Sequence, residues 1–382
     1  MSRFLFALVA GSALLGLAAP AEAAPRRVPQ GWLGVTVDGP VGAEDRAEWR
    51  AMATSGVEST RVGFWWQQLQ PRKSASGLPP GALVRFRDPA GVPTDFSITD
   101  GIVAAAAARG LPVLPVVQGA PRWAALRPAK PASPPGDLAA VERLMVALVG
   151  RYGPRGTLWQ ERPDLPRVPI RAWQIWNEPN LRDFWSEQPF ARSYVRVLRA
   201  ASRGVRRADP GATVVLAGLT KKSWLALRAI YEAGGGGLFD AVALHPYTLR
   251  PADVLRVVRY ARAEMRARGD RRMPVWITEF TWPAAQRKLE PGTPFDTTDR
   301  GQARKLDAVL GLLAAARRRQ NIERTYWYTW LSSETGASAF QWSGLRRVRR
   351  GRSVGTPALG VFRRWARRLE GCPKSADARR CA

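Results

Sequence analysis

The sequence predicts an α/β protein folded as a (β/α)8 TIM barrel. Short runs of β-branched and aromatic residues alternate with amphipathic segments over most of the 382-residue chain. Near-continuous apolar strands separated by helices are typical of a parallel sheet covered by helices. Eight strands and eight helices in roughly 340 residues fit a closed barrel better than an open, doubly wound sheet.

Each predicted strand is a short apolar run. In chain order the runs read GVTV, STRVGF, VLPVV, AWQIW, TVVLA, AVAL, VWIT and TYWYT, at residues 34–37, 59–64, 113–117, 172–176, 213–217, 241–244, 275–278 and 325–329. The segment after the first strand, DGPVG, lacks the glycine spacing of a dinucleotide-binding turn. The pattern therefore favours a barrel over a nucleotide-binding sheet.

Amphipathic segments between these runs predict the covering helices. They are expected at residues 43–54, 100–109, 137–152, 190–208, 222–233, 251–268 and 298–319, with 357–368 after the last strand. The four glycines at 234–237 are interpreted as a helix stop before the sixth strand. The long connections at 67–95 and 153–171 are expected to wall a cleft.

The two ends of the chain indicate export. Arg3, the apolar run to Ala19 and a small-residue site at Ala21–Ala23 predict a signal peptide over residues 1–23. The run is short for a membrane span, so no membrane attachment is expected after its removal. Residues 24–371 are assigned to the barrel and 372–382 to a tail in which Cys372 and Cys381 are expected to form a disulfide. The sequence thus predicts a secreted protein, extracellular or associated with the cell envelope.

The formal charge of +28 comes from 59 basic and 31 acidic residues. Most of the basic residues are arginines scattered along the chain, as expected from a bias toward GC-rich codons. Blocks at 317–319 and 346–350 could hold an acidic polymer, but a solvated basic surface is the simpler interpretation. No nucleic-acid motif accompanies the charge, so no nucleic-acid partner is expected. A single histidine makes a zinc site improbable, and no metal or cofactor is expected.

Two carboxylates stand where a barrel carries its chemistry. Catalytic groups of such barrels sit at the C-terminal ends of the strands. Glu178 follows the fourth predicted strand and Glu279 follows the seventh, on opposite sides of the barrel mouth. Two carboxylates that face each other across a cleft are what glycoside hydrolysis requires. Both could instead be solvated helix caps or ion-pair partners of nearby arginines.

The neighbours of these two residues resemble a known group of enzymes. WNEP at 176–179 after the fourth strand, with TEF at 278–280 after the seventh, resembles the clan A retaining glycoside hydrolases. The likeness is greatest to family 39 and its relatives, with family 5 next. It covers most of the predicted mature chain, because other strand ends also match: Arg61, Trp123 in PRW, His245 and Tyr247 in HPY, and Trp330.

The resemblance implies a role for each matching residue. Glu178 would be the general acid/base and Glu279 the nucleophile, with carboxyl groups about 5–5.5 Å apart. Asn177 would bind the sugar 2-hydroxyl. Tyr247 would donate a hydrogen bond to Glu279, and Arg61 would keep that carboxylate ionised.

The remaining matches would shape the pocket. His245 would line it, or be a structural residue with satisfied hydrogen bonds. Trp330 would form the apolar floor under the sugar, and Trp123 would contact substrate. Trp65, Trp66, Trp123 and Trp282 could be platforms at outer sugar sites, and loop packing explains each of the four equally well. Gln118, where family 5 enzymes carry histidine, favours a family 39-like protein, and Thr281 departs from the glycine frequent in relatives.

The sequence therefore predicts a secreted retaining glycosidase that acts on an oligo- or polysaccharide. A carbohydrate-binding barrel without turnover and a polyanion-binding surface protein are the alternatives. Steep salt dependence of binding would identify the last of these. Asp38, directly after the first strand, is interpreted as a turn residue. The sugar, the linkage, exo or endo action and the oligomeric state stay open.

Overall fold

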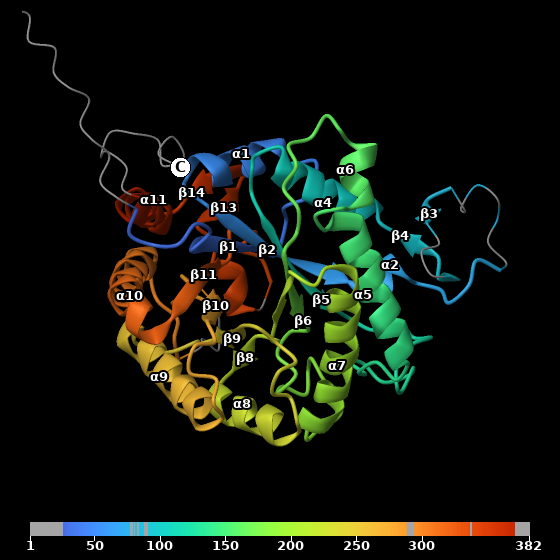
Figure 1. Cartoon of the computed structure of the whole chain (residues 1–382). Coiled ribbons are helices and arrows are strands. Elements are labelled where there is room, and N and C mark those ends of the chain that lie inside the picture. The colour runs from blue at the N-terminus through green and yellow to red at the C-terminus, as the bar shows by residue number, and fades with distance from the viewer. Residues whose placement is uncertain are drawn as a thin grey trace, which may run out of the picture.

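A computed structural model of the chain describes residues 26–370, apart from 77, 78, 80, 82, 83, 88–90, 289–293 and 337. The predicted signal peptide and both cysteines lie outside the described residues. Within them, eight parallel strands form a barrel that helices surround (Figure 1). The predicted fold class is confirmed.

Every predicted apolar run overlaps a barrel strand. The strands are β1 Leu33–Val37, β2 Ser59–Trp65, β5 Val113–Gln118, β6 Ala172–Ile175, β7 Thr213–Val215, β9 Val242–His245, β10 Val275–Phe280 and β11 Ile322–Tyr328. A short strand, β8 Leu219–Thr220, follows β7 and pairs with β9.

The barrel closes at two places that sequence alone does not mark. β1 pairs in parallel with both β2 and β11, so that Leu33 faces Thr325. Between β7 and β9, a parallel bridge joins Val215 to Ala241, and the Leu216 N–H donates to the Ala241 carbonyl at 2.9 Å. The carboxyl ends of all eight strands therefore meet at one mouth.

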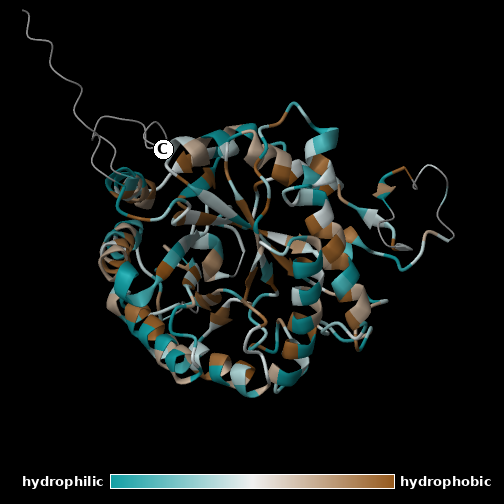
Figure 2. Cartoon of the chain, in the orientation of Figure 1, coloured by the Kyte–Doolittle hydropathy of each residue, from teal (hydrophilic) through white to brown (hydrophobic). Residues whose placement is uncertain are grey.

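Eight long helices cover the barrel. They are α1 Arg46–Thr54, α4 Ser97–Ala107, α5 Leu138–Tyr152, α7 Ala191–Ala208, α8 Ser223–Glu232, α9 Pro251–Ala267, α10 Asp299–Gln320 and α11 Pro357–Glu370. In Figure 2 these helices carry both hydrophilic and hydrophobic stretches, as expected of helices with one face on the barrel. No helix among the described residues is long and apolar enough to cross a membrane.

Local hydrogen bonds explain where the helices begin. The Asp137 carboxylate accepts the Ala140 N–H at 2.9 Å and caps α5, and Thr298 caps α10 in the same way. α1 starts three residues later than predicted, because Asp45 accepts the Gly42 N–H at 2.6 Å and holds a turn there. α4 starts three residues earlier than predicted, where Asp95 accepts the Ser97 N–H.

The two long connections differ in where they lie. The first carries the short helix α2 Trp66–Leu69 and the hairpin of β3 Phe86–Arg87 and β4 Thr94–Asp95. The second, residues 153–171 with α6 Thr157–Glu161, joins the end of α5 to the start of β6. It therefore lies at the end of the barrel opposite the mouth. The expectation that this connection walls the cleft is wrong.

A small sheet fills the connection between β11 and α11. β13 Arg346–Arg349 pairs with β12 Leu331–Ser332 and with β14 Arg352–Gly355, and the 3-10 helix η2 Ala339–Trp342 lies between β12 and β13. Arg347 is buried and forms ion pairs with Asp299 and Glu334. Arg346 pairs with Glu48 at 2.9 Å. These two arginines are internal, so neither an exposed basic surface nor an acidic-polymer site includes them.

Candidate active site

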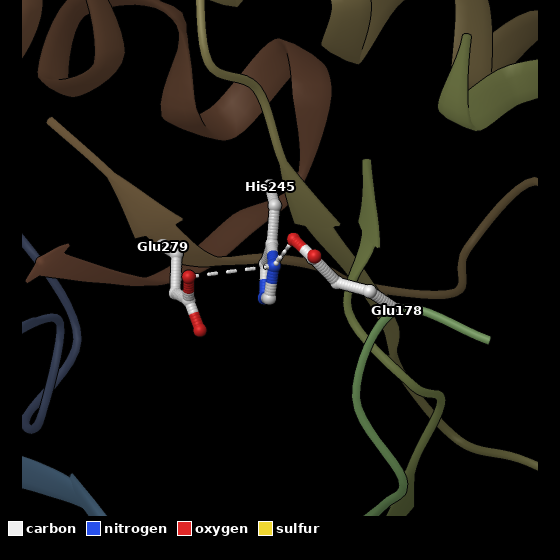
Figure 3. Close-up of side chains that lie close together, drawn as sticks. All are labelled: Glu178, His245 and Glu279. Carbon is white, nitrogen blue, oxygen red and sulfur yellow. Dashed lines mark hydrogen bonds and ion pairs between the residues drawn. The ribbon is translucent and has the colours of Figure 1, made fainter. Parts of the chain in front are cut away.

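The two carboxylates lie at the mouth of the barrel and face each other (Figure 3). Glu178 follows β6, and Glu279 is the last residue but one of β10. Both side chains are buried, each residue keeping 7% of its surface exposed. The backbone before Glu178 is unusual, because Trp176 (φ +73°) and Glu178 (φ +43°) both adopt left-handed conformations. Such conformations are costly outside glycine and gather at functional sites.

His245, the last residue of β9, stands between the two carboxylates. Its Nδ1 lies 2.7 Å from Glu178 Oε1 and 3.6 Å from Glu279 Oε2. One oxygen of each carboxylate and this nitrogen all lie within 4.8 Å of one another. Carboxyl groups of inverting glycosidases are about 6.5–9.5 Å apart, whereas those of retaining enzymes are about 5–5.5 Å apart. The nearest oxygens of Glu178 and Glu279 are therefore closer together than the roughly 6.5–9.5 Å typical of inverting enzymes.

Glu279 is held as a carboxylate. Arg61 Nη1 lies 2.5 Å from its Oε1, and the Tyr247 hydroxyl donates to its Oε2 at 2.5 Å. Burial alone would raise the pKa of Glu279, but the His245 ring, the Arg61 guanidinium and the Tyr247 hydroxyl together bring that pKa below its usual value. Burial and the two carboxylates raise the pKa of Tyr247 well above its usual value, so this phenol keeps its proton and donates.

Arg61 is itself fixed by two further contacts. Its Nε donates to Gln174 Oε1 at 2.8 Å, and its Nη2 donates to Asn177 Oδ1 at 2.7 Å. Gln174 is a polar residue in the middle of the apolar strand β6, a signal that sequence reasoning overlooked. The side-chain oxygen of Asn177 already accepts a hydrogen bond from Arg61. The amide nitrogen of Asn177 therefore remains as a donor for another partner.

The His245 ring is fixed from its other side. Its Nε2 lies 3.0 Å from the Thr278 hydroxyl, and the ring is completely buried. When Thr278 donates to Nε2, the proton of the neutral ring resides on Nδ1 and points at Glu178. Neither Thr278 nor Gly218, the glycine next to this ring, was identified as a site residue from the sequence.

Tyr247→Phe is expected to move the acid limb of the kcat/KM profile to higher pH. The hydroxyl stabilises ionised Glu279, so its loss raises the pKa of that carboxyl, and the nucleophile role expected for Glu279 needs the ionised form. A hydrogen bond to a charged group is worth about 1.5–3 kcal/mol, which corresponds to a shift of about one pH unit or more. Tyr260→Phe, on the exposed outer face of α9, is the control. An unmoved acid limb would contradict the role of Tyr247.

Gly218→Ala is expected to lower kcat/KM at least about 100-fold, as misplacement by about 1 Å can do. A Cβ at this buried position would lie 2.0 Å from His245 Nε2, so the ring must leave its contacts with Thr278 and Glu178. Kinetics and the unfolding temperature are measured together. Gly150→Ala is the control, because nothing lies within 4 Å of the added carbon. Full activity in Gly218→Ala would show that the ring position does not matter.

The cluster of Glu178, His245 and Glu279 contains metal-ligand types. Both oxygens of Glu279 already accept charged or phenolic donors, and His245 Nδ1 is hydrogen-bonded to Glu178. A guanidinium 2.5 Å from one ligand would repel a divalent cation. Glu178, His245 and Glu279 therefore form a buried ion-paired group with Arg61, and this arrangement does not fit a metal site.

The prediction for Trp330 is wrong. Its ring is completely buried in the core, and its indole N–H donates to Glu48 Oε2 at 2.8 Å, away from the mouth. The aromatic residue at the end of the last barrel strand is Tyr328. Trp330 therefore stabilises the junction with α1 and is not a substrate floor.

Trp123 lies in the connection after β5. It is half-buried, packs edge-on against Trp66 and donates its indole N–H to the Gln70 carbonyl at 2.8 Å. Trp65 is 40% exposed, whereas Trp66 and Trp282 are buried. No described contact joins Trp123 to either carboxylate.

A row of aromatic rings borders Glu279 and was not predicted. Tyr247 packs against Phe340 of η2 with centroids 5.0 Å apart, and Phe340 packs against Tyr328 at 5.8 Å. Phe295 contacts both Tyr247 and Phe340. Phe295 and Phe340 come from irregular connections, where the sequence has no periodicity to place them.

Comparison with known proteins identifies the fold. No protein-family model matches the chain. A family 39 glycoside hydrolase from the gut symbiont Bacteroides cellulosilyticus WH2 superposes with a TM-score of 0.60 at 18% identity, over 89% of this chain and 64% of that one. A monomeric β-xylosidase from Caulobacter crescentus CB15 gives 0.57 at 17% identity, over 89% and 69%. The chain has the clan A glycoside hydrolase fold.

More distant members of the clan A fold also match. An α-L-arabinofuranosidase from Thermotoga maritima superposes with a TM-score of 0.55 at 12% identity, over 90% of this chain and 71% of that one. In sequence, the β-xylosidase of Geobacillus stearothermophilus is 25% identical over 170 residues. That match covers 39% of this chain and 32% of the enzyme, about a third of the relative's length.

Proposed function

We propose that this protein is a glycosidase that cleaves O-glycosidic bonds with retention of anomeric configuration. The observation that carries the proposal is the unequal setting of two closely spaced, buried carboxylates. Arg61 and Tyr247 hold Glu279 ionised, whereas among the described residues the side-chain hydrogen-bond partner of Glu178 is His245. Retaining hydrolysis needs one carboxylate and one carboxylic acid in the same site, and different surroundings can provide them.

In the first step an oxygen of Glu279 forms a bond to the anomeric carbon. The bond from that carbon to the leaving oxygen breaks, and Glu178 gives its proton to the leaving oxygen. The product is a glycosyl ester on Glu279. Water then attacks the same carbon, Glu178 takes a proton from it, and the ester bond breaks to release Glu279 as a carboxylate.

The neighbouring residues support both steps. Nδ1–H of His245 can donate to Glu178 Oε1 in either charge state, which leaves the other oxygen for the leaving group or for water. The Asn177 amide nitrogen is the donor for the sugar 2-hydroxyl, because Arg61 occupies its oxygen. The chemistry uses protein side chains and water alone.

The structural neighbours support the proposed substrate class. Proteins described as a β-xylosidase and a glucosidase share this fold, so we propose an oligo- or polysaccharide substrate. The test is hydrolysis of 4-nitrophenyl β-D-xyloside, β-D-glucoside and α-L-arabinofuranoside, with the anomer formed first followed by proton NMR. Turnover with retained configuration is expected. An inverted product would refute the retaining mechanism, and no turnover on any glycoside would refute the glycosidase.

We further propose that the chain is exported. Sequencing the N-terminus of the secreted protein should give a start at Ala24, after loss of residues 1–23. In the mature protein, intact mass should rise by two hydrogens on reduction of the Cys372–Cys381 bridge. An exported chain that still begins at Met1 or Ser2 would contradict the signal peptide, and two thiols that alkylate in the native protein would contradict the bridge.

A further inference from the structure

Asp38 is connected to the nucleophile by an unbroken series of contacts. Tyr247 donates to Glu279, packs on Phe340, and Phe340 packs on Tyr328. The Tyr328 hydroxyl then donates to Asp38 Oδ2 at 2.6 Å. Burial, Asp38 and Glu279 together raise the pKa of Tyr328, so its hydroxyl stays a donor to Asp38. One aromatic row therefore runs from Glu279 to Asp38.

The Asp38 carboxylate is fixed and still accessible. The backbone N–H of Asp38 donates to the Thr329 hydroxyl at 3.3 Å, and that hydroxyl donates to the Thr36 carbonyl at 2.7 Å. The residue is exposed, and its Oδ1 has no hydrogen-bond or ion-pair partner among the described residues. The carboxylate of a turn residue would accept a hydrogen bond from a nearby backbone N–H, as Asp45 accepts from Gly42. Asp38 instead presents a free acceptor oxygen.

The order of strands places Asp38 on the side of the mouth away from Glu178. Around the barrel, β1 is separated from β6 by β2 and β5, and from β10 by β11. Glu178 protonates the leaving oxygen, so the leaving group lies on the β6 side of the anomeric carbon. A sugar ring bonded to Glu279 would then extend from that carbon toward β1 and β11, along the aromatic row.

We propose that Asp38 binds a hydroxyl of the sugar ring held by Glu279, at a ring position away from the anomeric carbon, and so selects a neutral sugar that has this hydroxyl free. The proposal rests on the proposed glycosidase function. A carboxylate oxygen accepts strongly from a hydroxyl, and it repels a carboxylate or sulfate on the sugar. A site built to bind a hydroxyl discriminates strongly against an analogue that lacks it.

The test combines one substitution with one missing hydroxyl. Asp38→Ala and wild type are compared on the 4-nitrophenyl glycoside cleaved fastest in the panel above, and on two deoxy analogues of it. Each analogue lacks one free hydroxyl away from the anomeric carbon, at C3 or C4 of a pyranoside and at C3 or C5 of a furanoside. Asp38→Ala should lower kcat/KM about 10- to 100-fold on the parent glycoside. On the analogue that lacks the bound hydroxyl it should change kcat/KM less than about 3-fold. Equal losses on the parent and on both deoxy analogues would overturn the proposal.

Matched variants separate recognition from a structural effect. Glu44→Ala removes the same charge from an exposed residue of the same connection and should leave kcat/KM and the unfolding temperature unchanged. Tyr328→Phe keeps the ring and removes the donor to Asp38, so it should blunt the discrimination against the deoxy analogue. Binding of the same three glycosides to Glu279→Ala, measured by calorimetry, gives the answer without turnover. Glu279→Ala is expected to bind the parent glycoside more tightly than the analogue that lacks the bound hydroxyl. The double variant Glu279→Ala/Asp38→Ala is expected to lose this difference. Equal affinities of Glu279→Ala for all three glycosides would overturn the proposed role of Asp38 even if the glycosidase function is correct.

Discussion

Glu279→Ala is expected to abolish turnover on every glycoside, with kcat reduced by about 10⁴-fold or more. The carboxylate both forms the bond to the anomeric carbon and stabilises the positive charge that develops there. Its loss therefore removes the nucleophile as well as this stabilisation. Glu279→Gln, which keeps the shape and loses the charge, should be equally inactive. Kinetics on activated and unactivated aryl glycosides measure the effect.

Azide distinguishes the nucleophile from other essential residues. In Glu279→Ala a small anion can occupy the space of the lost carboxylate and attack the anomeric carbon from the same face. The glycosyl azide formed should therefore have the configuration opposite to that of the substrate. Unchanged activity in Glu279→Ala would remove the glycosidase interpretation of this site.

Glu178→Ala is expected to slow hydrolysis according to the leaving group. A 2,4-dinitrophenyl group leaves without a proton, so formation of the glycosyl ester should be nearly as fast as in wild type. A poor leaving group should lose a factor of about 10²–10⁴, the usual contribution of general acid catalysis. Breakdown of the ester should be slow in both cases, because the base that activates water is missing.

The product with azide separates this variant from the previous one. Azide needs no base and attacks the ester on Glu279, so Glu178→Ala should give a glycosyl azide with the configuration of the substrate. Equal losses on all leaving groups, without azide rescue, would contradict the acid/base assignment.

The strands and the two carboxylates could be predicted because their signals are local. Each barrel strand is an apolar run; Glu178 lies three residues after the end of β6, and Glu279 is the last residue but one of β10. Arg61, His245 and Tyr247 sit at fixed offsets from other strands, so the resemblance could find them. The structure brings all five into one group of contacts.

The errors fall where a residue's role depends on a distant partner. Four aromatic residues, Tyr326, Trp327, Tyr328 and Trp330, lie in or just after the last strand, and the sequence does not say which of them faces the mouth. Trp330 is drawn into the core by Glu48, 282 positions earlier. In the sequence, Arg347 belongs to a basic block that reads as surface, but in the structure it forms ion pairs with Asp299 and Glu334. Only tertiary contacts distinguish these cases.

The pairing of the first and last barrel strands has a consequence for when the site can exist. Strand β1 finds its second neighbour, β11, only after residue 325 has been synthesised, and Phe340 follows later still. Closing so long a loop is slow and is completed late in folding. At about 5–20 residues per second, a nascent chain spends roughly 15–70 s without this pairing. Until that pairing forms, the chain carries Glu178 and Glu279 without the closed barrel that brings the two carboxylates together.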